Sequence, residues 1–234
     1  MGYRRSRARK QFEGDIRRIL ATISEAYSKE CSSTAVREFA LCSGVLLSSA
    51  KLESYIEDLL ADWGSSIRLQ RVATDKLPRR ARAFLLNQPA IAAAYRKYVA
   101  EDDEESLLSK LESSIGQGHY DFAIDGRTLP AFRPEMLYAD RKYPSPKNLR
   151  RLFKRFGVVD FFSEMNRLSK RDIEALLTSF NDLRTELGHV GMPVGQSVND
   201  IKQRIRDIKL VVAYVDRMFY SKVRSTVGSN CWIS

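Results

Sequence analysis

The segment from residue 34 to residue 63 restricts the fold most, because it is patterned as a helix and is apolar on most of its sides. Such a helix is stable in water only when other elements cover it all round. The rest of the chain contains further helical segments that could cover it. Apolar side chains recur at helical spacing in segments that we predict as helices near 12–29, 34–63, 78–87, 90–100, 103–116, 146–156, 170–189 and 198–224. The sequence therefore predicts an all-α bundle with long central helices.

Two stretches depart from this helical pattern. Residues 1–11 carry arginines at close spacing and predict a mobile basic arm before the first helix. Residues 117–145 are rich in glycine, proline and aromatic residues, and predict an ordered, irregular insertion with a short hairpin around Asp125-Gly126. The chain has 234 residues, of which 44% are hydrophobic, so it can bury a large core. We expect one domain over residues 12–234, interrupted by the insertion.

Composition indicates the cellular compartment and the kind of partner. No stretch approaches 18 uninterrupted apolar residues, and the arginine-rich start lacks the apolar run of a signal peptide, which predicts a soluble, unexported protein. Three cysteines, Cys31, Cys42 and Cys231, form an odd set without metal-ligand spacing, so we expect no disulfide framework, metal or cofactor. These features fit the cytoplasm. A net charge of +10, with 26 arginines, favours polyanions such as RNA as partners.

Arg184 occupies an unexpected position in the helix predicted at 170–189. Apolar side chains form one stripe along this helix, and Arg184 falls close to its middle at about 100° per residue; the stripe consists of Ile173, Leu176, Leu177, Phe180, Leu183 and Leu187. A charge there needs a partner, an interface or a function. The alternative is an ordinary surface arginine whose charged end reaches the solvent.

His189 follows five residues later, near a predicted helix end. Gly188, Gly191 and Pro193 indicate that the helix frays or stops there, which would let His189 turn toward Arg184. In the simpler alternative, the histidine only interacts with the helix C-terminus. Glu53 is a second polar residue in an apolar row, because it shares a face of the 34–63 helix with Cys42, Leu46 and Leu60. We predict that its carboxylate lies within hydrogen-bonding distance of Arg184 or His189, unless it lies at the rim of the buried face.

A second feature is a separation of charge in the segment 146–156. Leu149, Leu152, Phe153 and Phe156 share one face, whereas the opposite face carries Lys147, Arg150, Arg151, Lys154 and Arg155. Such a strip could follow a phosphate backbone, although an ordinary solvated helix face has the same pattern. Lys202 and Arg206 line one flank of the last helix, soon after His189, and are further candidates for binding RNA.

These residues resemble a known family. The run Arg184-Thr185-Glu186-Leu187-Gly188-His189, at the end of a helix and followed by a long amphipathic helix, resembles the signature of the HEPN superfamily. Residues 47–60 and 143–157 are similar to the RiboL-PSP-type and abortive-infection subgroup, so the resemblance covers roughly residues 34–225. Thr185 stands where family members often carry Asn or Asp, which leaves the role of that position open.

The resemblance implies a metal-independent endoribonuclease acting as a toxin or phage-defence effector, with a homodimer that joins two copies of the motif and an antitoxin or neutralising protein as partner. The residues themselves suit this chemistry. A histidine can remove the 2′-OH proton or protonate the leaving oxygen, and an arginine can stabilise charge on phosphorus. Only two histidines occur, and His119 lies in the insertion. The alternative is a non-catalytic HEPN bundle that binds RNA or protein.

Overall fold

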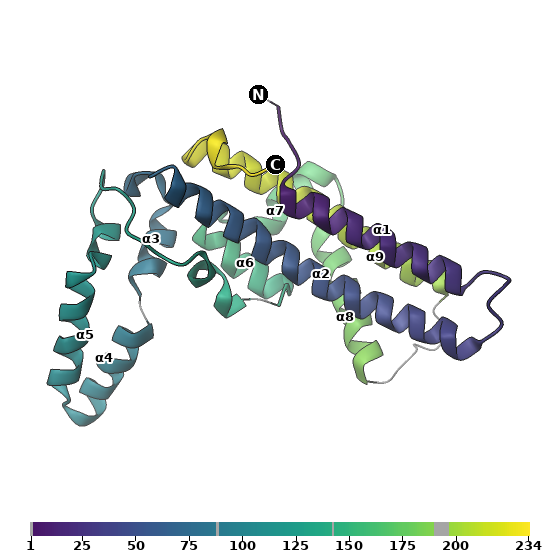
Figure 1. Cartoon of the computed structure of the whole chain (residues 1–234), viewed down its shortest axis with the longest axis horizontal. Coiled ribbons are helices and arrows are strands. Elements are labelled where there is room, and N and C mark those ends of the chain that lie inside the picture. Colours follow the sequence, from purple (N-terminus) through teal and green to yellow (C-terminus); the bar gives the residue numbers. More distant parts are fainter. Residues whose placement is uncertain (1, 88, 142, 190–196) are drawn as a thin grey trace.

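A computed structural model describes the chain apart from residues 1, 88, 142 and 190–196 and the side chains of Pro89, Arg141 and His189. Within this part the elements are helices, so the predicted all-α class is confirmed, and Ala73 and Thr128 form an isolated antiparallel bridge. Figure 1 shows long helices lying side by side and a helical hairpin that projects from them. The α-helices are α1 (Arg7–Ala26), α2 (Thr34–Leu69), α3 (Arg79–Leu86), α4 (Pro89–Glu101), α5 (Glu104–Gly116), α6 (Pro146–Arg155), α7 (Phe161–Ser169), α8 (Ile173–His189) and α9 (Val198–Thr226).

The long helices α1, α2 and α9 form the centre of the fold. Phe12 and Ile16 of α1 are buried against α2 and α9, at the i, i+4 spacing that keeps side chains on one face. Gly44 lets α1 approach α2 closely, because a Cβ atom at this position would lie 2.6 Å from Cδ1 of Ile23. At the other end of α2, Trp63 packs edge-on against Phe156 and Phe219, which joins α2, α6 and α9.

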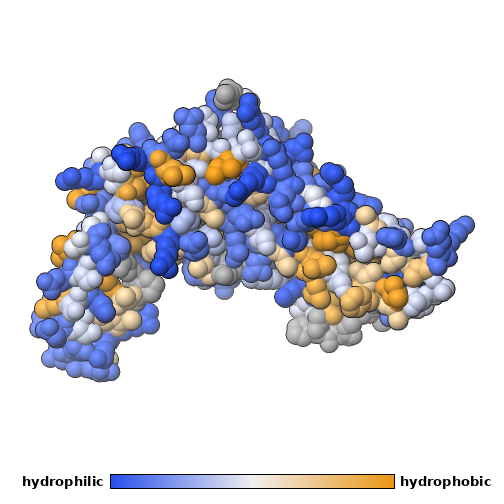
Figure 2. All heavy atoms as spheres, viewed as in Figure 1, coloured by the Kyte–Doolittle hydropathy of each residue, from blue (hydrophilic) through white to orange (hydrophobic). Residues whose placement is uncertain are grey.

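The prediction that neighbours surround the 34–63 helix on all sides is correct only for its C-terminal half. Leu52, Leu60 and Ile67 are buried, whereas Phe39 is 74% exposed and Leu47 is 51% exposed. Figure 2 shows apolar residues gathered over the N-terminal half of α2. The physical reason is that α2 extends past the helices that cover its far end (Figure 1), so this half has neighbours on fewer sides.

The predicted mobile basic arm is wrong, because α1 begins at Arg7 and the residues before it are packed. Ser6 is the N-cap of α1 and accepts a hydrogen bond of 3.0 Å from the backbone of Arg9. The Tyr3 hydroxyl donates to the buried carboxylate of Asp216 on α9, at 2.5 Å. Arg9 reaches Glu13 at 2.7 Å and Arg7 reaches Asp62 at 2.5 Å. The arginines that suggested an arm are therefore mostly paired within the protein.

The irregular segment 117–145 contains short 3-10 helices: η2 (His119–Ala123), η3 (Pro134–Leu137) and η4 (Ala139–Arg141). It is ordered by aromatic packing, for example of Phe122 against Phe132 at 6.0 Å between ring centroids. The expected hairpin around Asp125-Gly126 is wrong. The chain turns there, but the backbone of Thr74 donates to Arg127 at 2.8 Å, so the pairing joins this segment to residues near the end of α2.

Helix α7 was missed from the sequence. It is short, at nine residues, and it ends at Lys170 in the left-handed conformation. Its burial depends on distant partners, since the ring of Phe161 stacks on Phe153 of α6 at 4.7 Å. None of the described helices is long and apolar enough to cross a membrane.

Candidate functional site

Helix α8 carries the sequence-predicted site and is fixed at its start by local hydrogen bonds. The side chain of Asp172 accepts from the backbone of Ala175 at 3.0 Å, and that of Asn166 accepts from Ile173 at 2.9 Å. These contacts satisfy backbone N–H groups that have no partner within the helix. Buried Ile173, Phe180 and Leu183 then hold the helix against the bundle.

The angular position of Arg184 around the axis of α8 places it on the buried face of the helix, yet its side chain is exposed. Figure 1 shows why: the C-terminal end of α8 extends beyond the body of the bundle. The premise that a buried charge forces a partner on Arg184 is therefore wrong for a single chain. The guanidinium is nevertheless held, because it lies over the ring of Tyr143 at 5.3 Å from the centroid.

Tyr143 links the segment before α6 to the end of α8, and sequence reasoning did not assign it to the site. Its carbonyl accepts from the side chain of Asn148 at 3.0 Å, within the turn that caps α6. Burial raises the pKa of the Tyr143 phenol, Arg184 lowers it, and the carboxylates of Asp182 and Glu53 raise it. The phenol is therefore protonated near neutral pH and can donate a hydrogen bond.

Glu53 lies in the same neighbourhood, since its charge acts on Tyr143. It is half-buried, which agrees with a position at the rim of the buried face. Among the described side chains, no hydrogen bond or ion pair joins Glu53 to Arg184, so that part of the prediction is not met. The other part of the prediction concerns the side chain of His189. Only the backbone of His189, the last residue of α8, is described, so this part lies outside the described side chains.

Asn181 is a further residue that the sequence reading overlooked. It lies one turn before Arg184 and is 8% exposed, and neither its amide nitrogen nor its amide oxygen has a hydrogen-bond partner in the described part of the protein. An unsatisfied buried amide costs about 1–3 kcal/mol, so its retention calls for a structural or functional reason.

We expect Asn181→Leu to raise the free energy of unfolding by about 1 kcal/mol, because leucine fills a similar volume without an unsatisfied amide. Thermal and urea unfolding would measure this change. If Asn181 serves the site, RNA cleavage should fall in the same variant. A variant that gains stability and keeps full activity would assign Asn181 to the fold alone.

Helix α6 separates apolar from basic side chains as predicted, with one correction. Leu149, Leu152 and Phe153 are buried, and Lys147, Arg151 and Lys154 are exposed. Arg155 instead turns inward: its side chain is 12% exposed, pairs with Asp140 at 2.6 Å and lies 3.6 Å from the centroid of Phe84. Arg150 is exposed but forms an ion pair with Glu174. The basic strip that can meet a ligand without breaking an internal contact is thus Lys147, Arg151 and Lys154.

This strip leads away from Arg184. Tyr143, before α6, contacts Arg184 near the end of α8, whereas Arg150 contacts Glu174 near its start. The two helices therefore run antiparallel, and Arg151 and Lys154 lie progressively farther from Arg184.

Reversal of two charges on the strip tests whether it binds RNA. We expect Arg151→Glu with Lys154→Glu to lower RNA affinity by about tenfold at low salt and to flatten the salt dependence by about 1.4 in the log–log slope. Fluorescence anisotropy with a labelled oligonucleotide measures both. Unchanged affinity and slope would make this face an ordinary solvated surface.

The candidates on α9, Lys202 and Arg206, share one flank of the helix, and Lys202 points toward α1. The Lys202 amine donates to the hydroxyl of Ser24 on α1 at 3.0 Å, and Arg206 is exposed. Arg204, which was not singled out, reaches α8 through a hydrogen bond of 3.2 Å to the carbonyl of Ser179. The α9 side chain that lies beside α8 is therefore Arg204 rather than Lys202.

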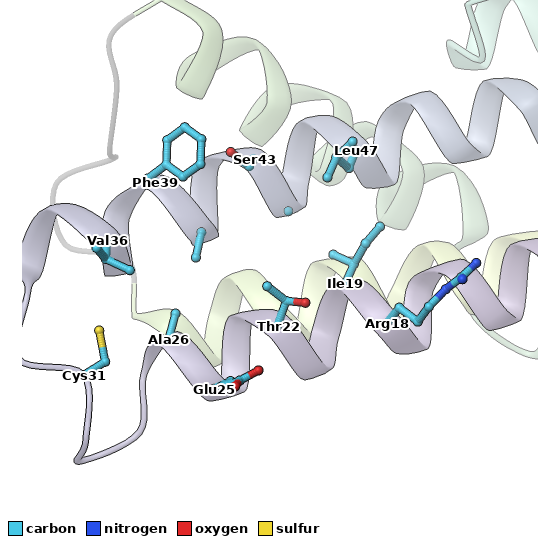
Figure 3. A pocket seen from close by; sticks show the side chains of 12 residues that line it. Arg18, Ile19, Thr22, Glu25, Ala26, Cys31, Val36, Phe39, Ser43 and Leu47 are labelled. Carbon is cyan, nitrogen blue, oxygen red and sulfur yellow. The ribbon is translucent and has the colours of Figure 1, made fainter.

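A strongly apolar groove lies elsewhere, between α1 and the exposed half of α2 (Figure 3). It measures about 640 Å³ and is lined by Ile19, Val36, Phe39 and Leu47, with Arg18 and Glu25 at its edges. Such a lining offers apolar contacts and no cluster of cations. It does not suit a phosphate backbone, and we place no RNA there.

Comparison of the chain with protein-family models, curated proteins and solved structures finds no match in any of the three. Among the described residues there is also no group of three or more His, Cys, Asp or Glu that could hold a metal ion. The residues around Arg184 and the motif resemblance are therefore the basis for assigning a function.

Proposed function

We propose that the protein is an endoribonuclease of HEPN type that cleaves RNA without a metal ion by attack of the 2′-hydroxyl. The observation that carries the proposal is the arrangement at the end of α8. Arg184 is exposed, its guanidinium is held over Tyr143, and it stands five residues before His189, the last helical residue. An exposed arginine held by an aromatic ring can receive a phosphate without losing an internal ion pair.

The chemistry divides between the two residues. His189 removes the 2′-OH proton or protonates the leaving 5′-oxygen, and Arg184 stabilises the negative charge that builds on phosphorus. The protonated Tyr143 phenol is close enough to Arg184 to keep its guanidinium oriented, and Glu53 adds a carboxylate to the same neighbourhood. The products would be a 2′,3′-cyclic phosphate and a free 5′-hydroxyl.

The direct test is a cleavage assay with purified protein and a chelator in excess. We expect structured or single-stranded RNA to be cut, with cyclic phosphate ends, and an oligonucleotide with 2′-O-methyl groups to stay intact. A protein that binds RNA but leaves it uncut would favour the alternative, a non-catalytic HEPN bundle that binds RNA or another protein. In this proposal the ribonuclease acts as a toxin or phage-defence effector, and an antitoxin neutralises it.

The proposed active form is a symmetric homodimer in which both Arg184/His189 pairs line one cleft. A two-fold interface joins identical surfaces, so two imidazoles can meet, one acting as base and the other as acid. Because both protomers contribute a histidine to the cleft, a dimer that contains one inactive protomer loses its activity. After subunit exchange with a ninefold excess of His189→Ala, activity per wild-type subunit should fall to about a tenth, because random pairing leaves few wild-type dimers. Constant activity per wild-type subunit, or a monomer that cleaves RNA, would refute the shared cleft.

A further inference from the structure

A second polar pocket lies between the C-terminal part of α9, α7 and the N-terminal segment. It measures about 360 Å³, and four of its lining residues are cations: Arg167, Arg217, Lys222 and Arg224. One carboxylate, Glu164, also lines it. The positive charge there comes from side chains alone, since both α7 and α9 present their C-terminal halves to the pocket.

The four pocket cations lack the ion-pair partners that several other cations in the described part of the chain have. Arg5 pairs with Glu13 at 2.8 Å and Arg82 with Asp125 at 2.6 Å. In the described part of the chain, no ion pair joins a carboxylate to any of the four pocket cations. Four cations against the single carboxylate of Glu164 leave the pocket with a net positive charge, so an anion from outside would relieve the repulsion among the cations.

The pocket walls are built from several elements. On α9, Arg217, Ser221 and Arg224 follow one another at i, i+4 and i+7, which places them on one face. The end of the Lys222 side chain lies against Gly157, where a Cβ atom would lie 3.0 Å from both Cε and the amine of Lys222. Helix α9 therefore positions Arg217 and Arg224, and the contact with Gly157 positions Lys222.

The N-terminal segment supplies the aromatic wall. The Tyr3 ring stands edge-on to Tyr220 at 5.3 Å between centroids, and the Arg217 guanidinium lies 5.9 Å from the Tyr3 ring. The Tyr3 hydroxyl is occupied by Asp216 and by Arg9, whose guanidinium donates to it at 2.6 Å. Because these contacts hold the ring, the wall is formed before a ligand arrives.

We propose that this pocket binds phosphate groups of nucleic acid or nucleotides. Arginine forks and serine hydroxyls are the donors that recognise phosphate oxygens, and a tyrosine ring beside them offers a surface for a sugar or base. The phosphate belongs either to the backbone of an RNA strand or to a free nucleotide. The pocket is built from different residues than the Arg184 site, so this binding does not require that the protein cleaves RNA.

The test compares two variants with equal changes in net charge. Arg167→Glu with Arg224→Glu alters the pocket, and Arg96→Glu with Arg133→Glu alters exposed arginines outside it. The probe is a single-stranded 2′-O-methyl oligonucleotide, measured by anisotropy from low to moderate salt. We expect the pocket variant to lose about tenfold or more in affinity and about 1.4 in salt slope, and the control variant to lose less than about twofold. Thermal unfolding confirms that each variant folds, and Arg167→Gln with Arg224→Gln replaces a pocket variant that does not.

A parallel arm with AMP and adenosine identifies the source of the phosphate. AMP that binds wild type, displaces the oligonucleotide and fails to bind the pocket variant would assign the site to free nucleotides. Oligonucleotide binding that depends on the pocket without competition by AMP would assign it to the RNA backbone. The proposal is overturned if neither probe responds to the pocket variant, or if the control variant loses as much affinity. Because the oligonucleotide cannot be cleaved, a failure here is distinct from a failure of the proposed ribonuclease.

Discussion

Replacement of His189 by alanine is expected to lower the rate of RNA cleavage by about 10²–10⁴-fold, the usual contribution of a general acid or base. The rate is measured in single-turnover assays with chelator present. His119→Ala is the matched control, because it removes the other histidine of the chain, which lies in the 3-10 helix η2. Equal loss in both variants would point to damage of the fold, and full activity of His189→Ala would end the proposed mechanism.

Arg184→Ala should lower cleavage by about 10²–10³-fold, because the guanidinium matters most when charge builds on phosphorus. RNA affinity should change far less, since a single exposed arginine contributes about one phosphate contact. The two quantities are separated by measuring the cleavage rate at saturating RNA and the affinity for uncleavable RNA. A parallel loss of both would make Arg184 a simple binding residue.

Deletion of residues 2–6 is expected to destabilise the protein by roughly 3–5 kcal/mol, because it removes three hydrogen bonds to a buried carboxylate and leaves only the longer one from Tyr55 at 3.4 Å. Asp216 is fully buried and accepts hydrogen bonds from the hydroxyls of Ser6 and Tyr3 and from the backbone of Ser6 at 3.2 Å. Burial raises the pKa of Asp216, and the contacts with Ser6 and Tyr3 lower it. The deletion also removes the N-cap of α1, a loss of about 1 kcal/mol.

Urea unfolding measures this destabilisation, and a second substitution assigns its cause. If the loss of donors to the Asp216 carboxylate is responsible, the deletion should cost much less when Asp216 is already leucine, since no charge is then left buried. Lys10→Ala is the control for charge, because Lys10 is an exposed cation in the same region. A mobile basic arm would predict no loss of stability on deletion, so a deletion variant as stable as the full chain would contradict the packing described above.

Helix positions were predictable because their signals are local. Serine N-caps at Ser33, Ser145 and Ser197 stand immediately before helices, and apolar spacing within each segment indicates which face is buried. The α6 segment shows the strength of such signals, since its apolar and basic faces are separated as expected. Helix α7 was missed because its burial depends on Phe153, which belongs to another helix.

The site was predictable only in part. The spacing of Arg184 and His189 is visible in the sequence, but Tyr143 is 41 positions from Arg184, and no local pattern connects the two. The basic pocket is similar: Arg217 and Arg224 share a helix face in the sequence, whereas Arg167 and Tyr3 reach them only in the folded chain.

Local patterns predict the helical class, the first residues of α2 and α9 and the separation of apolar from basic side chains on α6, because hydrophobic periodicity and capping act over a few residues. Which charges are paired depends on the folded chain. Ser6 and Asp216 are 210 positions apart, and Arg155 reaches Asp140 through a turn of the chain that no periodicity predicts. A charge is stabilised by whatever lies within a few ångströms of it, so its role depends on neighbours that the fold brings together.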